Sequence, residues 1–165
     1  LMPILLVSQA IPFFALAPLL VLWLGFGLGS KIAMAALIIF FPVTVAFFDG
    51  LSRTEPGFLD LARTMGASRW RLLTHVRLPA ALPSFASGFR VATAVAPIGA
   101  VIGEWVGSSH GLGYLMLHAN ARVQIDMVFA CLLILCAFSI TQYFLVDRAL
   151  RAALPWQPDS LKPAK

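Results

Sequence analysis

Four long apolar runs, separated by polar connections, dominate the hydrophobic pattern of this chain. They cover about residues 4–24, 32–48, 84–105 and 127–146. An α-helix rises about 1.5 Å per residue and needs roughly 20 apolar residues to cross the hydrocarbon core of a bilayer, so the second run is at the lower limit. We therefore predict an all-α protein, a polytopic bundle of transmembrane helices with four spans.

Prolines and small residues distinguish these runs from one another. Pro12 and Pro18 lie inside the first run and predict a kinked or locally unwound helix. The third run is dense in Ala, Gly and Ser, which allow close helix packing in lipid, so we expect it to be the central helix. Pro97 should bend this helix, and Arg90 is expected to reach back towards the preceding polar loop.

The longest polar interruption reads DLARTMGASRWRLLTHVRLPAALP from Asp60 to Pro83. Apolar residues enter it at the helical spacing i, i+3, i+4, i+7, namely Phe58, Leu61, Ala62 and Met65. This spacing predicts a first short amphipathic helix, which Gly66 then interrupts.

A second short helix is predicted directly after this glycine. Ser68 is a suitable N-cap, and the helix would carry Arg69 and the apolar positions that follow. Pro79 and Pro83 are expected to end it and to begin the third apolar run.

The spacing within this interruption resembles the "EAA" loop of permease subunits of ATP-binding cassette importers. That pattern is Glu-Ala-Ala, three residues, Gly, nine residues, then Ile-x-Leu-Pro. The chain has Asp60-Leu61-Ala62, Gly66 and Val76-Arg77-Leu78-Pro79 at the same spacings. The changes to Asp60 and Val76 are conservative, whereas Leu61 is larger than the usual alanine and could alter how the first helix seats.

The resemblance implies that the loop 58–79 docks onto a separate ATPase subunit. The residues that it assigns to this coupling are Asp60, Ala62, Gly66, Ala67, Ser68, Arg69, Trp70, Leu78 and Pro79. The alternative is an interfacial amphipathic helix with basic residues at the lipid headgroups. That alternative explains the arginines but not the spaced glycine and the Leu-Pro pair.

Two further stretches resemble the importer group that takes up sulfonates, nitrate, taurine and thiamine precursors. They are the run from Ile11 to Gly27 and the segment from Gly103 to Leu115, and the latter is most similar to permeases assigned to hydroxymethylpyrimidine. The resemblance implies a homodimer, a solute-binding protein and two ATPase subunits in a bacterial inner membrane. Residues 1–156 would form the transmembrane domain, lacking its N-terminal part because the chain opens at Leu1 in an apolar run, and 157–165 a disordered cytoplasmic tail.

Composition and charge agree with a bilayer protein. The chain is 60% hydrophobic and 12% charged, about half the charged share of soluble domains. Its net charge of +5 would suggest nucleic acid in a soluble protein, but here the basic residues flank the apolar runs. Four spans place ten of the twelve Arg and Lys on one side, with only Lys31 and Arg122 on the other. The loop 49–83 and the C-terminus are therefore predicted to be cytoplasmic.

Candidate pathway residues lie at the ends of the apolar runs. Glu104 borders the third run, where a carboxylate is either functional or merely solvated. Trp105 could stack on a flat ring or belong to the interfacial aromatic belt. Pro18 either kinks its helix for packing or lines a pathway.

The chain shows no residue pattern for covalent chemistry. It has no catalytic triad, paired carboxylates or metal-ligand spacing, and Gly25–Lys31 lacks the order of a phosphate loop. Cys131 and Cys136 are interpreted as packing residues. We therefore expect no enzyme activity, ATP site, cofactor or metal. The alternatives are a membrane enzyme or anchor subunit and a secondary transporter, but these need a polar cluster at membrane depth, where only Glu104 and Arg90 stand out.

Overall fold

A computed structural model describes residues 12–156, whose regular elements are all helices, with no strand among them. The longer elements are α2 (Phe13–Leu24), α3 (Leu28–Ser52), α6 (Leu78–Gly107) and α8 (Ile125–Ala153). The shorter ones are α4 (Pro56–Thr64), α5 (Arg69–Leu72), the π-helical turn η1 (Leu73–Arg77) and α7 (Leu112–Ala121).

Three helices are long and apolar enough to cross a membrane: Leu28–Ser52, the continuous helix Arg69–Gly107, and Ile125–Ala153. They correspond to the second, third and fourth predicted spans, so the predicted helical transmembrane fold is confirmed. Residues 4–11 of the first predicted span lie outside the described residues, and α2 forms the described part of it. The predicted tail 157–165 also lies outside them.

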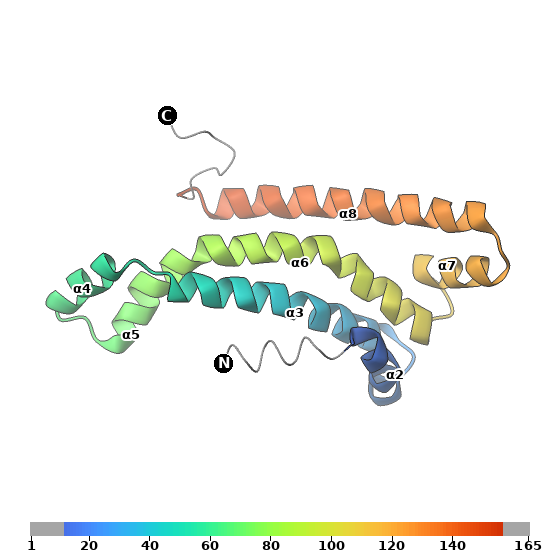
Figure 1. Ribbon diagram of the computed structural model, residues 1–165, viewed down its shortest axis with the longest axis horizontal. Coiled ribbons are helices and arrows are strands. Elements are labelled where there is room, and N and C mark those ends of the chain that lie inside the picture. Colours follow the sequence, from blue (N-terminus) through green and yellow to red (C-terminus); the bar gives the residue numbers. More distant parts are fainter. Residues whose placement is uncertain (1–11, 157–165) are drawn as a thin grey trace.

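Helix α6 is the centre of the arrangement, with α3 along one side and α8 along the other (Figure 1). Its buried residues are small: Ala81, Ala86, Gly88, Ala92, Thr93, Gly99, Gly103 and Gly107. A Cβ on Gly88 would lie 2.5 Å from the Cβ of Ala46, and one on Gly99 would lie 2.8 Å from the Cα of Ala35. The backbones of α3 and α6 therefore touch, which confirms the predicted central position of the small-residue helix.

Replacing Gly88 with alanine should destabilise the α3–α6 pair. The added methyl would overlap both Ala46 and the Pro42 carbonyl oxygen, 2.8 Å away, and overpacking of this kind costs about 1–3 kcal/mol. Gly29→Ala is the matched control, because the nearest atoms to its Cβ are 4.0 Å away. Thermal unfolding in detergent or nanodiscs measures both, and equal Tm values for the two variants would contradict this packing.

The second coupling helix does not end at the prolines, contrary to the sequence prediction. α5, η1 and α6 form one continuous helix from Arg69 to Gly107. In η1 the hydrogen bonds reach one residue further back, so that the Leu78 amide donates to the Leu73 carbonyl. This wider turn lies directly before Pro79, whose ring would clash with a carbonyl in a regular α-turn. The π turn therefore allows the helix to pass through Pro79.

The polar connection from Gly107 to Asp126 contains α7, which the sequence did not predict. Helix α8 continues beyond the predicted fourth span, 127–146, to Ala153. Cys131 is buried, as expected of a packing residue, whereas Cys136 is exposed on the described part of the chain.

Candidate functional site

The predicted coupling loop folds as a helix–turn–helix whose turn is a Schellman motif. The Ala67 amide donates to the Ala62 carbonyl at 3.0 Å, and the Gly66 amide donates to the Arg63 carbonyl at 2.9 Å. Gly66 has φ +76°, the left-handed conformation that this motif requires and that glycine adopts without strain. No atom lies within 4 Å of a Cβ built on Gly66, so its conformation and not crowding within this chain explains the glycine.

The second helix begins two residues later at the predicted cap. The Ser68 hydroxyl accepts a hydrogen bond from the Arg71 amide at 3.4 Å, as an N-cap does. α4 and α5 consequently stand beside each other at one end of the molecule, beyond the end of α3 (Figure 1). The predicted break at Gly66 after the first helix and the predicted start of the second helix at Ser68 are thus confirmed.

This helix pair presents apolar side chains to the outside. Phe58, Leu61, Met65 and Trp70 are each at least 59% exposed. Beside them is a shallow hollow of about 260 Å³, lined by Ala62, Met65, Ala67, Arg71, His75 and Val76. No described residue covers these side chains, so the surface is available to another protein.

The other residues assigned to coupling lie around this pair in different settings. The Asp60 carboxylate forms an exposed ion pair of 3.0 Å with Arg63 on the same helix. Arg69 lines a different hollow, described below. Leu78 and Pro79 belong to the first turn of α6 and therefore form the base of the loop instead of its tip.

Glu104 has a structural partner that the sequence did not reveal. Its Oε2 accepts a hydrogen bond of 2.7 Å from the Gly113 amide, in the first turn of α7. A Cβ on Gly111 would lie 2.3 Å from the Glu104 carboxylate. The carboxylate of α6 thus caps α7, where a negative charge is favoured by the helix dipole.

The two other candidate pathway residues are Trp105 and Pro18. Among the described residues, neither forms a hydrogen bond or ion pair with the Glu104 carboxylate. Trp105 makes an edge contact with Phe14 of α2, with ring centroids 6.3 Å apart. Pro18 lies within α2 and is exposed. Trp105 is therefore a packing contact between α6 and α2, and a pathway role for either residue remains a prediction.

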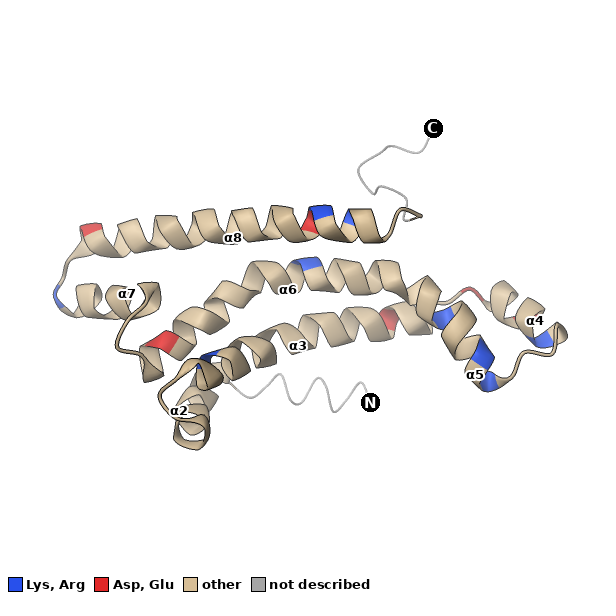
Figure 2. Ribbon diagram, turned by 180° about the vertical axis from the view of Figure 1, so that it is seen from behind, with Lys and Arg blue, Asp and Glu red and all other residues tan. Residues whose placement is uncertain are grey.

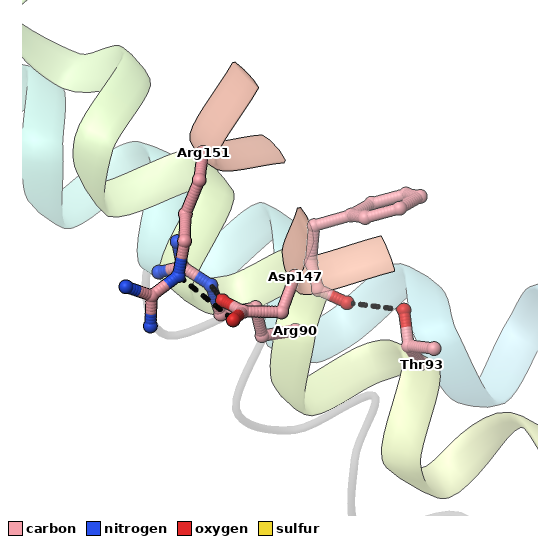
Figure 3. A network of polar contacts seen from close by, with 5 residues as sticks. Arg90, Thr93, Asp147 and Arg151 are labelled. Atoms are coloured by element: carbon pink, nitrogen blue, oxygen red, sulfur yellow. Dashed lines mark hydrogen bonds and ion pairs between the residues drawn. The ribbon is translucent and has the colours of Figure 1, made fainter. Parts of the chain in front are cut away.

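A second polar cluster joins α6 and α8 (Figure 3). Arg90 Nε lies 2.6 Å from Asp147 Oδ1, and Arg151 Nε lies 2.8 Å from Asp147 Oδ2. The Arg90 and Asp147 side chains are only 19% and 16% exposed. Arg90 thus points to α8. The prediction that it reaches back to the polar loop is wrong, because a buried charge is stabilised far more by a partner than by partial solvation. The sequence signal that could have indicated this ion pair is that Arg90 and Asp147, of opposite charge, lie near the same end of two predicted spans.

Comparison with known proteins identifies the family of this chain. Residues 1–155 match the family described as the binding-protein-dependent transport system inner membrane component. The chain belongs to this family. The multi-pass membrane fold of the described residues is the one expected of such a component.

Several proteins of known name are similar to this chain over most of its length. A probable ABC transporter permease protein of Haemophilus influenzae is 65% identical over 89% of this chain and 60% of its own length. The formylaminopyrimidine transport permease protein ThiX of Halalkalibacterium halodurans is 40% identical over 94% of this chain and 62% of its own length. The taurine transport system permease protein TauC of Escherichia coli is 32% identical over 93% of this chain and 56% of its own length.

The chain thus spans about three fifths of the length of these relatives. No solved structure matches it. The resemblance to importer permeases stated from the sequence is confirmed by the family and by the names of the relatives.

Proposed function

We propose that this chain is part of the permease subunit of an ATP-binding cassette importer and couples to a separate ATPase through α4, α5 and η1. The observation that carries the proposal is the exposed apolar helix pair with its glycine-dependent turn, in a chain whose relatives are transport permeases. A rigid turn that holds four apolar side chains outside a membrane protein is the kind of surface that a soluble partner covers.

The complete importer would contain a second permease copy, two ATPase subunits and an outer solute-binding protein. ATP binding would close the ATPase dimer and, through the coupling helices, move the spans to open the pathway outward. The chain itself would carry no chemistry. Reconstitution of the permease with its ATPase and binding protein tests this, and the expected result is ATPase activity that rises with loaded binding protein. An ATPase that ignores the permease would overturn the proposal.

The transported solute is proposed to be small and polar. A relative is named for formylaminopyrimidine transport and others for taurine and aliphatic sulfonates. We favour a hydroxymethylpyrimidine-type thiamine precursor over a sulfonate-, nitrate- or taurine-like anion, because the 40% identical relative carries a pyrimidine name and the taurine relative is 32% identical. Calorimetric binding of these compounds to the partner solute-binding protein decides between them.

Glu104→Gln separates a pathway role of the carboxylate from its capping role. The amide oxygen of glutamine can still accept the Gly113 N–H, so stability should change by less than about 1 kcal/mol, while the charge is lost. If the charge belongs to the pathway, uptake falls at normal expression. Glu104→Ala removes the cap as well and should also lower Tm. Normal uptake with glutamine would leave capping as the role of Glu104.

The proposed topology places the coupling helices and the C-terminus in the cytoplasm. The basic residues of α4, α5 and η1 lie at the same end of the molecule as the end of α8, whereas the starts of α3 and α8 lie at the other end (Figure 2). Single cysteines at Ser68 and Ser160 should be labelled only from the inner face, and one at the exposed Ser109 only from the outer face. Labelling of Ser68→Cys from outside would reverse the orientation.

A further inference from the structure

The coupling helices carry a second hollow, which differs from the apolar one in its residues and its chemistry. It has a volume of about 420 Å³ and is lined by Arg63, Arg69, Leu72, Leu73 and Arg77. No residue is shared with the apolar hollow. Three arginines, from α4, α5 and η1, therefore line one depression.

This basic hollow is short of negative charge. Arg63 pairs with Asp60 at 3.0 Å, but among residues 12–156 no carboxylate lies within 4.0 Å of the charged groups of Arg69 or Arg77. Like charges around one concavity repel each other, and the repulsion is relieved when an anion enters. Arg53, which lies outside this hollow, differs because it has Asp49 at 3.9 Å.

The position of Arg77 along the membrane helix indicates where this anion comes from. The 30 residues of α6 span about 45 Å, close to the roughly 40–45 Å of a bilayer with its headgroups. Arg77 directly precedes α6, so with Gly107 at one surface Arg77 lies at the headgroups of the other. Arg69 is eight residues further along the same helix, roughly 12 Å, and helix tilt reduces its distance from the surface.

We propose that the basic hollow binds the phosphate of an anionic phospholipid. Planar guanidinium groups bind phosphate oxygens in pairs, and basic pockets beside transmembrane helices bind acidic headgroups. Leu73, which is half-buried, and the buried Leu72 form the apolar part of the lining, against which the glycerol of a lipid can lie. A carboxylate of the ATPase is less favoured, because Met65 of the apolar surface proposed for that partner lines the other hollow and not this one.

The test is lipid retention by the purified full-length protein without its ATPase. Nanodiscs with mixed dioleoylphosphatidylglycerol and dioleoylphosphatidylcholine are prepared, and bound phosphatidylglycerol is counted by native mass spectrometry. Arg69→Gln/Arg77→Gln should lower its retention roughly tenfold or more. Arg53→Gln/Arg122→Gln removes the same charge outside the hollow and should retain the lipid as wild type does. The two single variants provide the comparison if the double variant inserts poorly.

Two results would overturn the proposal. Equal retention of phosphatidylglycerol by all the variants would show that the hollow does not hold a lipid phosphate. If Arg69→Gln/Arg77→Gln retains the lipid as wild type does but binds the ATPase more weakly in pure phosphatidylcholine discs, the hollow binds an acidic side chain of the ATPase. Lipid retention is measured on the permease alone, so its outcome is independent of whether the protein is an importer.

Discussion

Replacing Gly66 with valine is expected to leave the protein inserted in the membrane but to abolish the response of its ATPase partner to loaded binding protein. The reason is the backbone: Gly66 has φ +76°, and a β-branched residue there costs about 1–3 kcal/mol. The Schellman bonds to Ala62 and Arg63 would break, and α4 would leave its position beside α5. The spans lie outside this turn and should still form.

The measurement is ATPase stimulation in reconstituted complexes, with Gly66→Asn as the matched control. Asparagine also adds a Cβ but tolerates positive φ, so it should keep most of the stimulation if conformation is what matters. Loss of stimulation in both Gly66→Val and Gly66→Asn would show that the ATPase approaches Gly66 closely. Full stimulation with valine would mean that this turn does not couple, and the proposed function would lose its main support.

Asp60→Ala should act in the same direction but more weakly. It removes a charge from α4 and breaks the exposed pair with Arg63, and exposed pairs of this kind contribute little to stability. The turn itself remains intact.

The turn of the coupling loop could be predicted because its signals are local. In a Schellman motif the residue whose carbonyl accepts the longer bond precedes the left-handed glycine by four positions, and Ala62 and Gly66 have this separation. The Ala, three residues, Gly spacing of the sequence is therefore the spacing that the motif requires. Ser68 is likewise a cap that acts on an amide three residues away.

The features that were missed depend on contacts between different helices or on an irregular helical turn. α7 has only ten residues, and the group that caps it, Glu104, comes from another helix. The continuous passage through Pro79 depends on the longer hydrogen bonds of η1, which rules for regular α-helices do not include. Arg90 and Asp147 lie near the same end of two predicted spans, but the sequence does not indicate that α8 is the helix beside Arg90, so the fold was needed to assign the pair.

Replacing Asp147 with leucine should destabilise the protein by on the order of 3 kcal/mol, because it leaves a mostly buried arginine without its partner. Arg90 is 19% exposed and, among residues 12–156, pairs with Asp147 alone, whereas Asp147 also contacts Arg151. Arg90→Met should therefore cost less, since the carboxylate keeps one arginine. Arg151→Met should cost least, because that side chain is 46% exposed.

The double variant Arg90→Met/Asp147→Leu distinguishes a true pair from two separate effects. Apolar replacement of both members of a buried pair is often close to neutral, so the double variant should be more stable than Asp147→Leu alone. Thermal unfolding in nanodiscs gives the four Tm values of the cycle. Few side chains of α8 are buried, so this pair is expected to be the main attachment between the halves of α6 and α8 that lie nearer the coupling helices. A double variant that loses the sum of the two single losses would show that the charges act independently and do not hold these helices together.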